Sequence, residues 1–194
     1  MSSTMEPADL CDFLRDLDVS TILIEPKPKR DLLEKMFQSC QSVDCDHGLV
    51  NFRFVVVENE ARELFGAALV EAVPDLDEQS AYRLKSLAFE APQQIVLIIR
   101  LRNETIGLGT ETLVVLQKAF SFVHSLRLLA KIQGFSTKWV AFNGLTDGLM
   151  SKLFHLERGE SIVGWLDIGS DALNQNRLRS IRHYTQRLNF LEHR

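Results

Sequence analysis

The amino-acid sequence predicts an α+β domain in which a mixed sheet is flanked by helices, and three features indicate this class. Residues 52–59 and 93–102 are rich in Val, Ile and Phe, which is typical of strands. Residues 112–132 form a long apolar run that suits a central helix. Two shorter strand patterns, residues 135–142 and 161–169, follow this run. Strands that alternate with helices along one chain favour a sheet covered by helices.

The segments around the first strand have recognisable ends. Pro26 and Pro28 interrupt regular structure, because each lacks an amide donor, and Asp31 then suits the N-cap of a helix. Residues 42–51 are polar and predict a loop that leads into the strand, a common place for a functional site. After the strand, Asn59 suits the N-cap of a further helix.

The central helix has few polar positions, so we expect it to be buried on nearly all sides. Lys118, His124 and Arg127 argue against a membrane span. Gly134 fits the end of this helix, because a left-handed residue costs least without a Cβ. A short helix, with Thr146 or Asp147 as its cap, precedes the last strand.

Composition predicts one domain over residues 1–171, followed by a basic tail, 172–194, that is rich in arginine. The tail suits a solvated helix face, an arm onto a partner subunit, or a contact with nucleic acid or another anion. The net charge of -4 gives no general attraction to nucleic acid or to anionic lipid. Three cysteines are too few for a disulfide framework, and the acidic N-terminus lacks an apolar run. We therefore expect a cytoplasmic protein that binds neither membrane nor nucleic acid.

The second half of the chain carries a family resemblance. The segments "AKIQGFSTKW", "MSKLFHLERGE" and "SIVGWLDIGS" resemble the C-terminal half of the FMN-dependent nitroreductase family. The stretch from "EPKPKRDLLEKMF" to "NFRFVVVEN" is similar in outline to the first half of that family. The type it resembles is the minimal bacterial NAD(P)H nitroreductase, and the resemblance covers roughly residues 10–170.

The resemblance implies a nitroreductase-like fold and a homodimer with FMN at the subunit interface. It also implies hydride transfer from NAD(P)H through FMN to a small electrophilic acceptor, such as a nitro-aromatic or a quinone. In such enzymes the flavin performs the redox step, and the protein supplies placement and exclusion of water. No catalytic side chain is therefore predicted, and no metal.

The resemblance also implies positions that contact the cofactor. The family's loop has a variant that contains Asp-His, which matches Asp46 and His47, and Asn51 lies near the end of the same loop. In the second half, the backbone that follows the buried helix meets the flavin ring, and the matching residues are Lys138, Trp139 and Val140. Trp139 and Trp165 also suit plain core packing, because large aromatic residues dominate core burial.

The phosphate end of the cofactor has no direct match. The family begins with an Arg-Arg-Ser segment, whose place is taken here by Leu17, Asp18 and Val19. Asp18 would repel a phosphate, whereas Arg15 could hold it if the chain shifts by about half a helical turn. Arginines of the tail are further candidates, because a guanidinium binds phosphate at two points; they are Arg177, Arg179 and Arg182.

This missing segment leaves a second hypothesis open. The chain could be a homodimer of the same fold that has lost FMN and acts as a binding or regulatory protein, since a fold does not determine its chemistry.

Overall fold

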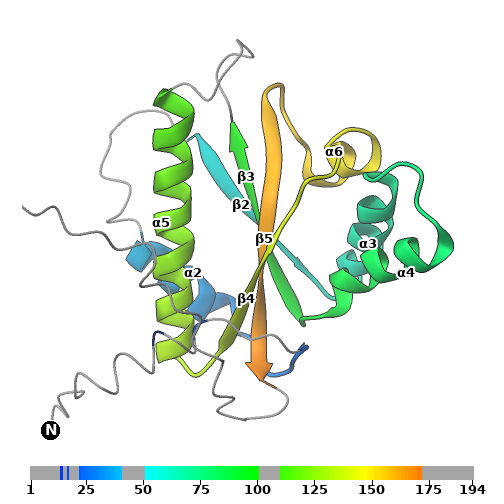
Figure 1. Cartoon of the computed structure of the whole chain (residues 1–194). Coiled ribbons are helices and arrows are strands. Elements are labelled where there is room, and N and C mark those ends of the chain that lie inside the picture. The colour runs from blue at the N-terminus through cyan, green and yellow to red at the C-terminus, as the bar shows by residue number, and fades with distance from the viewer. Residues whose placement is uncertain (1–13, 15–16, 18–21, 41–50, 101–109, 172–194) are drawn as a thin grey trace, which may run out of the picture.

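The computed structural model describes residues 14, 17, 22–40, 51–100 and 110–171, and in these a five-stranded sheet lies between two layers of helices (Figure 1). The strands are β1 (Leu23–Ile24), β2 (Phe52–Glu58), β3 (Gln93–Arg100), β4 (Ser136–Ala141) and β5 (Glu160–Asp171). The long strand β5 pairs with β1, β3 and β4, and β2 pairs with β3. The predicted α+β class is confirmed, and every pairing among the described strands is antiparallel, where we expected a mixed sheet.

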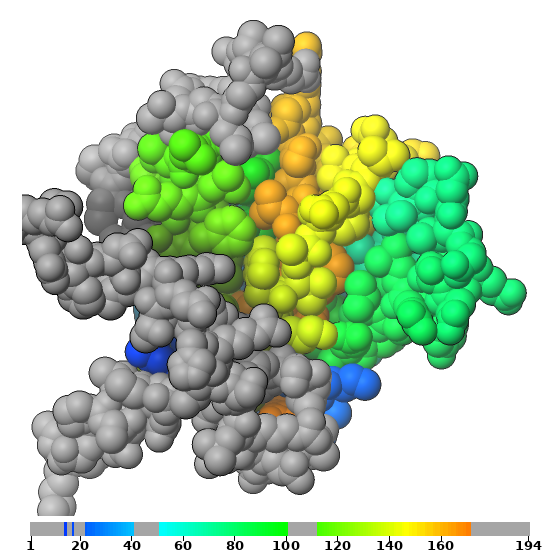
Figure 2. Space-filling view, viewed as in Figure 1, coloured from blue at the N-terminus to red at the C-terminus, as the bar shows by residue number. Residues whose placement is uncertain are grey.

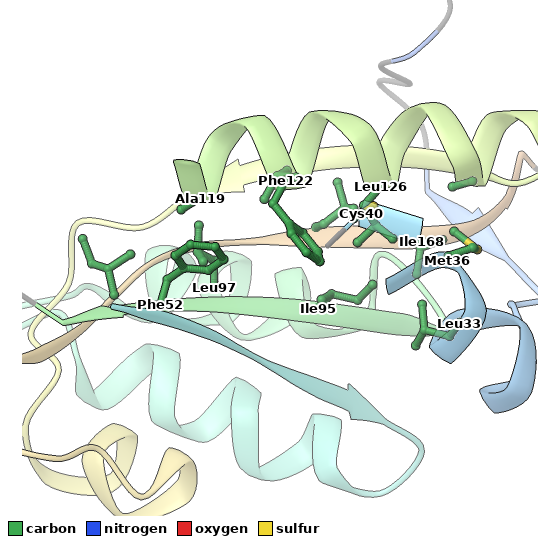
Figure 3. Close-up of a cluster of buried hydrophobic side chains, with 14 of the residues drawn as sticks. Leu33, Met36, Cys40, Phe52, Ile95, Leu97, Ala119, Phe122, Leu126 and Ile168 are labelled. Atoms are coloured by element: carbon green, nitrogen blue, oxygen red, sulfur yellow. The ribbon is translucent and has the colours of Figure 1, made fainter. Parts of the chain in front are cut away.

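One face of the sheet is covered by α2 (Arg30–Cys40) and α5 (Thr110–Ile132). Figure 3 shows α5 above the sheet, with Ala119, Phe122 and Leu126 directed toward the strands. Four phenylalanine rings pack together in this layer; they are Phe37, Phe52, Phe54 and Phe122. This core is largely apolar, as the sequence of α5 leads one to expect, and Gln93 and Thr137 are buried polar residues on the same face of the sheet.

The opposite face carries α3 (Ala61–Glu71), α4 (Glu78–Ser86), the 3-10 turn η2 (Leu87–Phe89) and α6 (Gly148–Phe154). Phe65 of α3 is fully buried and meets the rings of Phe154 and Trp165 edge-on. Trp165 of β5 is 1% exposed, which confirms that it packs in the core.

The prediction that α5 is buried on nearly all sides is wrong for the single chain. One stripe of the helix faces the sheet and is buried, for example Ala119, Phe122 and Leu126. Leu113 and Phe120 are 52% and 42% exposed, and Ile132 is 64% exposed. A helix that is apolar around most of its axis needs cover on two sides, and the described residues cover one. The segment Thr112–Ile132 also has the length and composition of a membrane span, and 33% of its apolar window is buried within the protein.

Two helix starts differ from the predicted caps. Asn59 adopts a left-handed φ of 54°, and Glu60 takes the N-cap position of α3 without a side-chain bond. Asp147 is at the N-cap position of α6, as predicted, but its side chain makes no capping bond. Glu71 of α3 accepts a hydrogen bond from the backbone N–H of Leu149 at 2.8 Å instead. A long-range carboxylate thus satisfies a helix terminus that a local side chain was expected to satisfy.

Another expected cap, Asp31, lies inside its helix, in the first turn of α2, which begins at Arg30.

Two glycines shape the β4–β5 pair. Gly134 has a φ of 85° and ends the turn between α5 and β4, as predicted. Gly164 lies next to a register shift between β3 and β5, and a Cβ on it would stand 2.3 Å from the carbonyl oxygen of Val140. The close approach of β4 to β5 therefore requires glycine at this position.

Candidate functional site

Strand β4, which holds three of the predicted contact residues, is an edge strand among those described. It pairs with β5 from Ser136 to Ala141, and no described strand pairs with its other side. In an antiparallel ladder every second residue directs its N–H and C=O away from the partner strand, so this edge presents backbone donors and acceptors. Figure 2 shows the β4 region at the surface between the α5 side and the α3–α4 side.

The three predicted residues of β4 divide between the two faces of the sheet. Trp139 packs on the α5 side, where its ring meets Phe120 edge-on at 5.5 Å between centroids. Val140 packs into the core on the opposite face. Because side chains alternate along a strand, Lys138 shares the face of Val140. The segment can therefore present its backbone to one ligand, but its side chains serve two different layers.

Lys138 makes a close ion pair with Glu90, the residue that follows η2. Their side chains are 27% and 25% exposed, so both are largely withdrawn from solvent. On its other side, Lys138 is the direct cross-strand partner of Asp167 in β5. The positive charge of Lys138 is thus engaged by carboxylates of its own chain.

Asp167 is a buried carboxyl group, 1% exposed, within the apolar central part of β5. Burial raises the pKa of Asp167 to about 7, because a charge is costly away from water; Lys138 opposes this rise and Glu90 adds to it. The Trp165 indole and the Gln94 amide favour the ionised form to a smaller degree, yet neither carboxylate oxygen has a hydrogen-bond partner in the described structure. Sequence reasoning missed this residue, although a lone Asp inside "SIVGWLDIG" was a usable signal.

Polar atoms without partners gather around this carboxyl group. Gln94 is the cross-strand neighbour of Asp167 on β3, and its amide nitrogen donates to the carbonyls of Ala88 and Ala91 at 2.9 and 3.2 Å. Its oxygen has no partner, and neither has the indole nitrogen of Trp165. Gln94, Asp167 and Lys138 form one polar row across three strands of the sheet.

The other predicted contact residues are not gathered here. Asn51 precedes β2, where its carbonyl accepts the N–H of Arg100 at 2.7 Å. Three strand spacings of about 4.8 Å separate β2 from β4, so Asn51 is remote from Lys138 within one chain. The remaining six lie outside the described residues; they are Arg15, Asp46, His47, Arg177, Arg179 and Arg182.

Comparison with known proteins tests the resemblance. The chain is 27% identical over 155 residues to a Haemophilus influenzae protein named "Putative NAD(P)H nitroreductase". The alignment covers 76% of this chain and 80% of that protein. The crystal structure of a nitroreductase-like family protein from Bacillus cereus matches over 100% of both chains, with a TM-score of 0.72 and 19% identity. The chain is similar in sequence to a protein named as a nitroreductase, and it shares the fold of nitroreductase-like proteins.

The nitroreductase fold is shared with further solved structures. The FMN-dependent nitroreductase of Mycobacterium smegmatis, solved in complex with NADPH, matches with a TM-score of 0.69 over 95% of this chain and 100% of that one, at 12% identity. No family model matches the sequence. The chain therefore shares its overall fold with nitroreductases at low sequence identity.

Proposed function

We propose that the protein is a flavin-dependent oxidoreductase that passes hydride from NAD(P)H through FMN to an electrophilic acceptor, such as a nitro-aromatic or a quinone. The observation that carries the proposal is the 27% identity to a protein named as an NAD(P)H nitroreductase, which extends over 76% of the chain. The fold shared with an FMN-dependent nitroreductase in complex with NADPH supports it.

The described part of the β4 segment supports a proposed contact with the ring end of a flavin. A flavin ring needs an apolar surface and a few fixed hydrogen-bonding groups, and the protein's part is to place the ring and tune it. The open edge of β4 offers backbone groups of that kind, and Trp139 and Val140 supply apolar surface on either side. Lys138 is engaged by Glu90, so the backbone of this segment is the better candidate for the ring contact.

The phosphate end would be held by arginines of the N-terminal segment or of the basic tail. Arg15, Arg177, Arg179 and Arg182 are the candidates, because Asp18 replaces the residue that the resemblance leads one to expect. Asp46, His47 and Asn51 are proposed to approach the same cofactor from a second subunit.

The proposed enzyme is a cytoplasmic homodimer joined through α5. The exposed apolar side chains of this helix support the proposal, since contiguous apolar surface on a soluble protein marks an interaction site. A second copy of the same helix would cover the apolar side chains of α5 that are exposed in the single chain.

Two measurements on the purified full-length chain test the function. Flavin absorbance that survives desalting after addition of FMN, together with oxidation of NADH or NADPH in the presence of a nitro-aromatic or a quinone, is the expected result. A colourless protein that takes up no FMN would contradict the proposal and favour the homodimer that has lost its flavin.

A further inference from the structure

Lys138 lies between two carboxyl groups that differ in burial. Its ammonium group pairs with Glu90, whose side chain is 25% exposed, while its cross-strand neighbour Asp167 is 1% exposed. The Cβ atoms of directly opposed residues in a sheet are about 5 Å apart, so a lysine side chain has the length to reach either group. One cation therefore has two possible partners.

The surroundings of Asp167 leave Lys138 as its main source of positive charge. From β3 the carboxyl group meets the uncharged Gln94, and from β5 itself the indole of Trp165. The charged groups that act on it are Lys138 on β4 and Glu90 before β3. Arg62 of α3 donates to the carbonyl of Ala91 at 3.1 Å and is held there. A buried carboxylate without a counter-ion is costly, whereas a partly exposed one is well solvated by water.

We propose that Lys138 is a two-position switch, in which its ammonium group moves from Glu90 to Asp167 when Asp167 ionises. The exchange replaces a partly exposed ion pair by a buried one, where the same attraction is stronger because the local dielectric is lower. It needs no cofactor, and so it goes beyond the proposed function.

The switch has a structural consequence at β1. The carbonyl of Glu90 accepts the N–H of Leu23 at 2.7 Å, and this bond joins the segment before β3 to β1. When Lys138 leaves Glu90, the side-chain anchor of that segment to β4 is lost. The hydrogen bond to Leu23 then opens more often.

The pH at which the switch operates follows from the raised pKa of Asp167. The folded-state pKa is about 7 against an ordinary value of 3.8, so this group's contribution to stability is lost as pH rises toward 7. Between pH 5.5 and 8.5 the unfolding equilibrium constant is expected to rise about 30-fold from this group alone. Asp167→Asn is expected to remove that rise. The difference between the parent chain and Asp167→Asn therefore separates the effect of Asp167 from any effect of the histidines.

The first test follows the Asp167 carboxyl carbon by NMR from pH 5 to 9, in the full chain without added flavin. Glu90→Gln removes the competing carboxylate, so the midpoint is expected to fall by about one unit; Lys138→Met is expected to raise it by a similar amount. Glu63→Gln, which removes a carboxylate paired with Lys85 on α3 and α4, is the matched control and should leave the midpoint unchanged. An unchanged midpoint in Glu90→Gln, or a midpoint below pH 5 in the parent chain, would overturn the proposal.

The second test measures hydrogen exchange at the amide of Leu23. Its protection factor, corrected for intrinsic exchange, is expected to fall several-fold from pH 5.5 to 8.5 in the parent chain and to stay level in Asp167→Asn. Equal behaviour of the two proteins would show that ionisation of Asp167 does not reach Glu90, and the switch would be rejected.

Discussion

The two layers of the protein are built from the same sheet but differ in chemistry. On the α5 side the core is dominated by phenylalanine, with the uncharged Gln93 and Thr137 buried at its margin, and one face of its long helix is exposed. On the α3–α6 side the core is closed around Phe65 and Trp165, yet it contains Gln94 and Asp167 with unsatisfied polar atoms. The first layer has apolar side chains exposed on its outer helix face, and the second layer has a buried carboxyl group without hydrogen-bond partners. We infer that the first serves association and the second responds to pH.

Removal of a buried phenylalanine ring from each layer is expected to have the largest effect on stability. Phe65→Ala and Phe122→Ala are each expected to lose about 3–5 kcal/mol of unfolding free energy, because both remove a buried ring. Phe65→Ala alone should also lower the pKa of Asp167, since it opens space beside Trp165 through which water can enter. Urea unfolding and the Asp167 titration measure the two effects. An equal change of the titration in Phe122→Ala would show that the layers are not separate.

A methyl group added at Gly164, where β4 and β5 approach closely, should lower the unfolding free energy nearly as much. In Gly164→Ala the Cβ would meet the carbonyl oxygen of Val140 at 2.3 Å and Trp139 Cζ2 at 2.7 Å, so β4 must shift. We expect a loss of about 3 kcal/mol, at the upper end of overpacking effects. Gly134→Ala is the comparison, because nothing lies within 4 Å there and the cost arises from its positive φ alone. Thermal unfolding of both variants would show whether the strand contact or the backbone angle matters more.

A second carboxylate on the α6 side should show the opposite dependence on pH. Glu160 accepts hydrogen bonds from Arg53 at 3.1 and 2.9 Å, and these bonds, with the guanidinium charge, lower the pKa of Glu160 to about 2. Its contribution is present above the ordinary value of 4.5 and is lost as pH falls toward 2.

We therefore expect Glu160→Gln to cost about 1–2 kcal/mol at pH 7 and little near pH 2, a modest value because Arg53 is partly exposed. Denaturant unfolding at several pH values measures it. A cost that is constant with pH would contradict the assignment.

The smallest expected change in stability tests the exposed face of α5. Leu113→Glu is expected to alter the stability of the single chain by about 0.5 kcal/mol or less, because the side chain is 52% exposed. It should nevertheless convert a dimer to a monomer, since the charge would be buried at the proposed interface.

Tyr82→Glu on α4, where the ring is 76% exposed, is the matched control and should remain dimeric. Light scattering after gel filtration measures the mass of each. A parent chain that is monomeric at micromolar concentration would remove the proposed interface.

The elements themselves were predictable because strong local patterns specify them. The β-branched runs of β2 and β3, the apolar run of α5 and Gly134 at its end all lie where the sequence indicated. The site was less predictable. Lys138, Trp139 and Val140 are consecutive in sequence, but the alternation of a strand sends them to opposite layers.

The sequence by itself determined which segments become helices and strands, since hydrophobic period, β-branched residues and glycine act locally. Only the tertiary structure decided that Lys138 lies beside both Glu90 and Asp167, and that Glu71 accepts the N–H of Leu149, 78 positions away, at the start of α6. The physical reason is that burial and charge pairing depend on which strands become neighbours, and strand neighbours such as β3 and β5 are joined through a register that no single segment encodes.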